Sequence, residues 1–246
     1  MDPRLKLLSY SSLLTFHSCP RKYQLQKLNA QVTIPEDIPG SLTLAYGKTV
    51  GKGIQDILEA KPWNQVLLEA FLEWEVDLLH ENPRQNKSFW GALVALKQFE
   101  SMREHGYLEG YELVQYNSKP AVELSFVIHL PDGFKYRGYV DAVLQHQTTG
   151  EVLALEVKTT NSSAVNPAQY KNSAQAIGYS IVLDALFPTL NSYEVIYLVY
   201  QTKAESYQQL NFEKSYYSPI VVHLWVRWLR SLGSLLRVVL ELDLQV

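Results

Sequence analysis

Residues 138–158, GYVDAVLQHQTTGEVLALEVK, decide the fold that we expect for this chain of 246 residues. The stretch predicts two neighbouring strands joined by a polar turn, with Asp141 on the first strand and Glu156 and Lys158 on the second. Because side chains alternate across a strand, Glu156 and Lys158 point to one face and Val157 to the other. When the pair folds back as a hairpin, Asp141 can lie beside Glu156, so that two carboxylates and an ammonium share one small site.

The predicted cluster of charges is flanked by Val, Leu and Ala, and isolated charges in such surroundings are costly unless they are paired or bind a metal ion. Carboxylate oxygens suit Mg²⁺ or Mn²⁺, and a lysine beside such an ion can position or deprotonate a water molecule or steady a phosphate. The alternative is a solvated sheet face with an ordinary Glu156–Lys158 ion pair, because a single pair of this kind is common and weak. The features that flank the stretch favour the metal site.

The order of Asp141 and the Glu-Val-Lys of residues 156–158 resembles the PD-(D/E)xK nucleases. It is most similar to their RecB-like branch, which includes the CRISPR-associated exonucleases. Three other features match that branch in the expected order, and the resemblance spans about residues 9–200. They are the opening helix and Cys-Pro motif SYSSLLTFHSCPRKYQL at residues 9–25, the early acid Glu123, and the Gln-xxx-Tyr helix with Gln175 and Tyr179. Each motif is short, and the specificity comes from their joint order.

The resemblance implies a fold and a domain organisation. The fold is α/β (α+β), with a restriction-endonuclease-like core in which helices flank a central mixed β-sheet. Residues 1–246 would form one such domain, with an N-terminal helical insertion at about residues 62–108 that covers the active-site cleft. The length agrees with this expectation, since 246 residues can bury a sizeable core without disulfides.

The resemblance also implies a chemistry, which is metal-dependent hydrolysis of phosphodiester bonds in DNA. The branch trims DNA ends as an exonuclease, in recombination, repair or phage DNA processing. Mg²⁺ or Mn²⁺ would be held by four groups, namely Asp141, Glu156, the Val157 carbonyl and the outer acid Glu123. Lys158 would orient or help to deprotonate the attacking water, while Gln175 and Tyr179 would hold the scissile strand.

The sequence departs from the branch at two positions. Gln55, the last residue of Gly-Lys-Gly-Ile-Gln, stands where the branch has a metal-binding His. Its carbonyl oxygen could bind Mg²⁺ more weakly, or it is an ordinary amide on a helix surface. Cys19 is the one cysteine of the chain, so four cysteines of this chain cannot hold an iron–sulfur cluster. We expect Cys19 to be a small buried residue beside Pro20.

Composition and charge limit the class of protein. The net charge of −3 excludes a surface that is basic overall, so any contact with DNA depends on a local patch. Arg21 and Lys22 form one such patch on a predicted helix, where they could hold a phosphate backbone or could simply be solvated. One cysteine excludes an intramolecular disulfide and fits a reducing compartment. Neither a secretory signal nor an apolar run of 18 residues is present, so we expect a cytoplasmic location and no membrane contact.

Hydrophobic periodicity predicts the other elements. Apolar residues at helical spacing predict helices at residues 42–60, 63–81, 89–104, 169–186 and 219–244. Alternating patterns predict strands at residues 112–116, 121–130, 134–144, 193–201 and 207–212, and the last two are expected to pair.

A second hypothesis belongs to another class of protein, a degenerate nuclease fold that binds DNA or a partner protein and cuts nothing. Gln55 and the missing cluster cysteines favour it, whereas the intact Asp141, Glu156 and Lys158 favour an enzyme. A nuclease that acts on RNA is a third hypothesis, because nothing in the sequence distinguishes the sugar. The sequence leaves open whether the protein works alone or beside a helicase or recombination partner.

Overall fold

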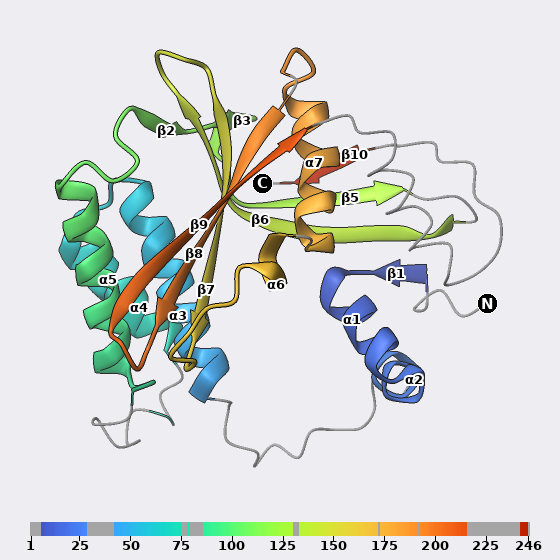
Figure 1. Ribbon diagram of the computed structural model, residues 1–246, viewed down its shortest axis with the longest axis horizontal. Helices are drawn as coiled ribbons and strands as arrows, with labels where there is room; N and C mark the ends of the chain where they lie inside the picture. The colour runs from blue at the N-terminus through green and yellow to red at the C-terminus, as the bar shows by residue number, and fades with distance from the viewer. Residues whose placement is uncertain are drawn as a thin grey trace.

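A computed structural model describes residues 6–28, 42–74, 78, 86–129, 133–171, 173–190, 192–215 and 242–245 (Figure 1). Its helices are α1 (Tyr10–Ser18), α2 (Pro20–Leu28), α3 (Leu42–Leu58), α4 (Trp63–Glu73), α5 (Phe89–Glu104), α6 (Ala168–Lys171) and α7 (Ala174–Leu186). Its strands are β1 (Leu7–Leu8), β2 (Tyr111–Leu113), β3 (Gln115–Tyr116), β4 (Lys119–Pro120), β5 (Val122–His129), β6 (Lys135–His146), β7 (Val152–Thr160), β8 (Ser192–Gln201), β9 (Ser206–Ser215) and β10 (Leu242–Gln245).

The main sheet has the strand order β10-β5-β6-β7-β8-β9, and β1 and β2 also pair with β6. The pairs β5–β6 and β6–β7 are antiparallel, because only a few residues join the strands of each pair. By contrast, β7 and β8 are parallel and are connected through α6 and α7. The predicted pairing of the last two strands is confirmed by the antiparallel pair β8–β9.

Helices cover both faces of this sheet, and alternate side chains of β7 show the division. Val152 and Ala154 belong to a core that includes residues of α1 and α7. Leu153 and Leu155 belong to a second core, which includes residues of α3, α4 and α5. Burial on both faces explains the continuous apolar run at the start of β7. The predicted fold class, a central mixed sheet flanked by helices, is therefore confirmed.

The strands β6 and β7 separate beyond their hairpin turn. Their backbone pairing ends at Ala142 and Leu155. From there β6 continues beside β5, and β1 becomes its other neighbour, whereas β7 continues beside β8 to its own end. Figure 1 shows the divergence, with β5 and β6 running to the right and β7, β8 and β9 running to the lower left. A gap between β6 and β7 therefore begins where Asp141 and Glu156 stand.

Two predicted helices differ from the structure. The helix predicted at residues 169–186 is two helices, α6 and α7, because Ser173 caps the second one: its hydroxyl accepts from the Gln175 N–H at 3.2 Å. The helix predicted at residues 63–81 ends with α4, since the backbone of Trp74 is extended. Both α4 and α5 pack against α3. The description of their segment as an insertion stays a prediction.

Two further expectations are wrong. Residues 219–241 of the predicted terminal helix lie outside the described residues, but residues 242–244 belong to β10, which pairs with β5. Pairing satisfies backbone groups of β5 that would otherwise lie at an open sheet edge. Cys19 is exposed rather than buried, because it lies between α1 and α2 at the surface. Within the described ranges, no helix combines the length and the apolarity needed to cross a membrane.

Candidate active site

The register of the sheet places Asp141 opposite Glu156. Because Ala142 and Leu155 form the last backbone pair, Asp141 and Glu156 occupy the next two facing positions, at the mouth of the gap. The Val157 N–H points into this gap and donates to Asp141 Oδ2 at 2.8 Å. The placement of the two acids beside each other, which the hairpin predicted, is therefore confirmed.

The alternation of side chains between the two faces of β6 is interrupted at Asp141. Val140 and Val143 both belong to the core beneath α7, although residues three apart on a regular strand point to opposite faces. The register with β5 is the same on both sides of this point, so the irregularity is a local break in the alternation at the unpaired position of Glu123 and Asp141 and not an inserted residue. Here it separates the start of β6 from the part that pairs with β7, and it turns Asp141 toward the gap.

Glu156 is 2% exposed, and both of its carboxylate oxygens accept hydrogen bonds. Oε1 accepts from Gln175 Nε2 at 2.8 Å and from the Lys158 ammonium, and Oε2 accepts from the Tyr179 hydroxyl. The ammonium of Lys158 is also ion-paired with Glu156, and the Lys158 side chain remains 38% exposed. Glu156 is thus fixed by three donors, one of which reaches the surface.

The sequence of α7 explains how it supplies two of these donors. Ser173 sets the first turn of the helix, and Gln175 and Tyr179 are four residues apart, so they lie on one face. Gly178 allows α7 to lie close to β6, because a Cβ at this position would come 3.2 Å from the ring of Tyr136. Sequence reasoning assigned Gln175 and Tyr179 to the DNA strand. The structure instead joins them to Glu156, and a contact with DNA stays a prediction.

Burial and neighbouring charges perturb the ionisable groups. Burial, followed by repulsion from Glu156, raises the pKa of Asp141 to about 8. For Lys158, burial lowers the pKa, but attraction to Glu156 and Asp141 outweighs burial and holds the pKa above its usual value. Burial and the Glu156 carboxylate raise the pKa of Tyr179 well above its usual range. The Lys158 ammonium therefore stays charged, and the Tyr179 hydroxyl keeps the proton that it donates.

Glu123 and Gln55 meet on the other side of Asp141. Glu123 lies directly across from Asp141, between the backbone pairs Val122–Ala142 and Leu124–Val140 of β5 and β6. It has a left-handed φ of +47°, a conformation that few residues other than glycine adopt, and such strain is concentrated at functional sites. Gln55 on α3 donates to Glu123 Oε1 at 3.3 Å and is only 5% exposed. The interpretation of Gln55 as a helix-surface amide is therefore wrong.

The predicted basic patch lies apart from this cluster. Arg21 and Lys22 are exposed on α2, and the Arg21 guanidinium donates to Gln24 on the same helix at 2.7 Å. Within the described part of the chain, no hydrogen bond or ion pair connects either residue to the acids of the site. Their predicted contact with a phosphate backbone stays a prediction.

The donor set fits a hard divalent cation. Asp141 Oδ2 is taken by the Val157 N–H, which leaves Oδ1, and the Val157 carbonyl faces the same gap because the N–H and C=O of a strand residue point to one side. Mg²⁺ keeps several waters and needs only one or two carboxylates. Among the described residues, no group of three or more His, Cys, Asp and Glu is arranged to hold a metal ion, since the oxygens of Glu156 turn toward their donors. The complete ligand set stays a prediction.

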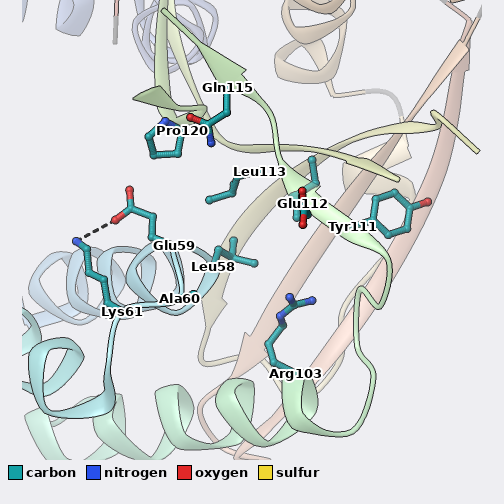
Figure 2. Close-up of a pocket in the computed structure, with 11 residues that line it drawn as sticks. Leu58, Glu59, Ala60, Lys61, Arg103, Tyr111, Glu112, Leu113, Gln115 and Pro120 are labelled. Atoms are coloured by element: carbon teal, nitrogen blue, oxygen red, sulfur yellow. Dashed lines mark ion pairs between the residues drawn. The ribbon is translucent and has the colours of Figure 1, made fainter. Parts of the chain in front are cut away.

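A cavity of about 720 Å³ lies beside this site but is separate from it (Figure 2). Leu58 and Lys61 at the end of α3, Arg103 of α5 and Glu112 of β2 contribute to its wall, and the Lys61 ammonium pairs with Glu59 at 2.9 Å. None of the acids in the gap between β6 and β7 lines it. The acids that the sequence predicted as a site therefore lie outside this cavity, where the pairing of β6 and β7 ends.

The fold brings Asp141 and the Glu-x-Lys of residues 156–158 together where two strands of a mixed sheet part, which is the arrangement that the resemblance to nucleases predicted. The family model of the PD-(D/E)XK nuclease superfamily matches residues 7–240, and the chain belongs to that superfamily. No curated protein matches the chain. Solved structures do, among them "Crystal structure of SSO0001", which is 13% identical, with 89% of each chain covered and a TM-score of 0.33. Membership of the superfamily indicates a nuclease, and such nucleases usually use divalent ions such as Mg²⁺ or Mn²⁺.

Proposed function

We propose that this protein is a divalent-metal-dependent deoxyribonuclease of the RecB-like branch, which trims DNA ends as an exonuclease. The observation that carries the proposal is the placement of Asp141 opposite Glu156, with Lys158 paired to Glu156 and half-exposed at the edge of the gap. A phosphodiester that enters the gap would meet two carboxylates and an ammonium within one small volume. Processing of DNA in recombination, repair or phage replication, in the cytoplasm and beside a helicase or recombination partner, is the setting that we propose.

Each residue of the cluster has a role that follows from its contacts. A divalent cation, when bound by Asp141, Glu156 and the Val157 carbonyl, would lower the pKa of water and stabilise charge on the phosphate. Lys158, which stays charged, attracts the phosphate and orients the water. Glu123 adds negative charge at the outer side of the gap.

Gln175 and Tyr179 act as positioning residues for Glu156. Tyr179 is buried and donates to Oε2, and Gln175 donates to Oε1, so the carboxylate is held in one orientation before substrate arrives. Donors of this kind around a metal ligand fix its geometry and tune its basicity. Gln175 Nε2 also donates to the Tyr179 hydroxyl at 2.6 Å, so a contact of this amide with a phosphate would replace one of its two hydrogen bonds.

A second candidate function is DNA binding without cleavage. The observation that favours it is the saturation of Glu156, since both of its oxygens are occupied by protein donors. A carboxylate that never releases a donor would be a structural group. The position of Gln55 beside Glu123, where the branch has a metal-binding His, points the same way.

The deciding experiment is digestion of linear and circular DNA, single- and double-stranded, with Mg²⁺ or Mn²⁺, by the wild-type protein and by Lys158→Ala. Loss of linear DNA that needs both metal and Lys158, with circles spared, is the expected result. Cutting of circles would change the proposal to an endonuclease. Binding of DNA with no cutting of any substrate would establish the second candidate. Digestion of RNA but not of DNA would change the proposal to a ribonuclease.

A further inference from the structure

The first half of β6 exposes a row of side chains that leads to Asp141. Lys135, Arg137 and Tyr139 alternate with the buried residues Tyr136 and Val140, so the three share one face of the strand. Lys135 and Arg137 are exposed, and Tyr139 is 56% exposed. The helices α3, α4 and α5 cover this side of the sheet over β7 and β8, but the core that they form includes no residue of β6 before Ala142.

The two cations of this row face no acidic residue on the neighbouring strand β5. On β5, the residues that face Lys135, Arg137 and Tyr139 are His129, Val127 and Ser125. Among the residues whose side chains the structure describes, no ion pair joins an acid to Lys135 or Arg137. One strand further out, β10 brings Asp243 to the position beside Val127. At the other end of the row, Glu123 is held by Gln55.

The combination of side chains in this row, rather than any one of them, points to a partner. Tyr139 is a large exposed ring on a strand, whereas the other large apolar side chains exposed to this degree in the described part of the chain lie on helices. Cations that alternate with an exposed ring are the combination used by sites that bind single strands: cations follow the phosphates and a ring stacks on a base. Successive same-face residues are about 6.6 Å apart, the scale of one nucleotide step in an extended strand.

We infer that a single-stranded polynucleotide lies along the exposed face of β6, with phosphates on Lys135 and Arg137 and a base stacked on Tyr139, and that it enters the gap at Asp141. This inference rests on the proposed function and specifies its substrate as an unpaired strand or strand end. A closed duplex fits less well, because its bases stack on one another and offer no free face to Tyr139. The row covers about 20 Å from Lys135 to Asp141, about three nucleotide steps.

The test measures binding by fluorescence anisotropy in EDTA, which separates binding from cleavage. The probes are a labelled single-stranded DNA, the RNA of the same sequence and a blunt DNA duplex. The variants are Tyr139→Ala and the double variant Lys135→Gln/Arg137→Gln. The matched control is Trp90→Ala/Lys97→Gln, which removes an exposed ring and an exposed cation from α5. Thermal unfolding of each variant establishes that the fold is intact.

Tyr139→Ala is expected to weaken the binding of single strands about tenfold and to leave duplex binding within about twofold. The double variant is expected to weaken all binding and to reduce the slope of log K against log salt by about 1.4, because each phosphate contact on a single strand contributes about 0.7. The control is expected to bind as the wild type. Comparing the loss of affinity for single-stranded DNA with the loss for RNA then shows which of the two nucleic acids binds along the row.

Several outcomes would overturn the inference. They are no binding of single strands by the wild type, unchanged binding by Tyr139→Ala and by the double variant, or an equal loss in the α5 control. The proposed function fails separately, when neither single- nor double-stranded linear DNA is cleaved or when cleavage does not depend on Lys158. Lys158-dependent cleavage with unchanged Tyr139→Ala binding would therefore remove only the strand path along β6.

Discussion

The two sides of Asp141 are built differently. On the α7 side, Glu156 is 2% exposed and receives three donors, two of them from one helix face. On the α3 side, Glu123 is exposed, has a left-handed backbone, and receives one described hydrogen bond, from Gln55 at 3.3 Å. The two acids flank the same aspartate and have the same chemistry.

This difference in burial and hydrogen bonding implies that the Glu156 carboxylate has a fixed orientation and that the Glu123 carboxylate can change its orientation. A buried carboxylate with full hydrogen bonding keeps one orientation, because losing any donor would leave a polar group unsatisfied. An exposed carboxylate with one long hydrogen bond can turn toward a cation or a phosphate at little cost. We therefore expect Glu156 to determine whether the reaction occurs and Glu123 to modulate it, and the following predictions test that division.

Glu156→Gln is expected to abolish cleavage, with a loss of about 10³-fold or more, because it removes charge that metal binding and phosphate stabilisation both need. Glu123→Gln, measured in the same assay, is expected to lose about tenfold or less. Initial rates of end digestion across a range of Mg²⁺ concentrations give both values. Equal losses in the two variants would show that the division between a pre-set and an adjustable acid is wrong.

Tyr179→Phe removes the hydroxyl from Glu156 Oε2 and is expected to lower activity about 10- to 100-fold while raising the Mg²⁺ concentration needed for half-maximal rate. The matched control is Tyr193→Phe, because the buried Tyr193 hydroxyl donates to the Ala176 carbonyl of the same helix at 2.8 Å. Both variants should lose stability, but only Tyr179→Phe should change the Mg²⁺ requirement. The same change in both would mean that the hydroxyl serves only the packing of α7.

Local sequence was sufficient for the hairpin that carries the acids. The turn at residues 147–150 is short and the period of the flanking strands is two, and a slip of one residue would have exchanged the two faces of β7 and moved Leu153 and Leu155 out of the core beneath α3. The register that follows from these constraints places Asp141 and Glu156 together, as predicted. The helix predicted at residues 42–60 from its periodicity is likewise present as α3, which ends at Leu58.

Sequence could not supply the contacts between distant segments. Gln55 and Glu123 are 68 residues apart, and nothing local in either segment indicates that the amide would donate to the acid. Tyr179 was identified as a site residue, but its partner depends on how α7 packs on the sheet, and the close approach of Gly178 to Tyr136 is one contact of that packing. The break between α6 and α7 had a local signal, because Ser173 precedes the apolar run as an N-cap residue does.

Asp141→Asn is expected to stabilise the metal-free protein by about 1–2 kcal/mol at pH 8 while abolishing cleavage, since the amide can still accept from the Val157 N–H without repelling Glu156. The pKa of Asp141 is raised from 3.8 to about 8, so the folded chain holds this proton more tightly than the unfolded chain does. This contribution to stability is therefore present at low pH and is lost as the pH rises from about 4 to about 8. Thermal unfolding in EDTA at pH 5 and pH 8 measures the difference.

Asp56→Asn is the control for the predicted gain in stability of Asp141→Asn. Asp56 is fully buried and accepts from Lys52 at 2.8 Å and from Lys61 at 2.6 Å, so its charge is compensated. Loss of that charge should destabilise the protein, in contrast to Asp141→Asn, because Lys52 would lose its acidic partner and Lys61 one of its two. Destabilisation by both variants would mean that Asp141 is also compensated in the folded chain.

Gln55→Ala is expected to have the smallest effect, a loss of activity of fivefold or less, on the order of 1 kcal/mol, because it removes one long hydrogen bond from an exposed acid. The informative measurement is a double-mutant cycle with Glu123→Gln. If Gln55 acts through Glu123, the double variant loses no more than Glu123→Gln alone, since the amide has nothing left to position. If the two losses add, Gln55 contacts the substrate or a cation by itself. That result would mean that the α3 side supplies ligands of its own. The α3 side and the α7 side of Asp141 would then differ only in how strongly each contributes to the reaction.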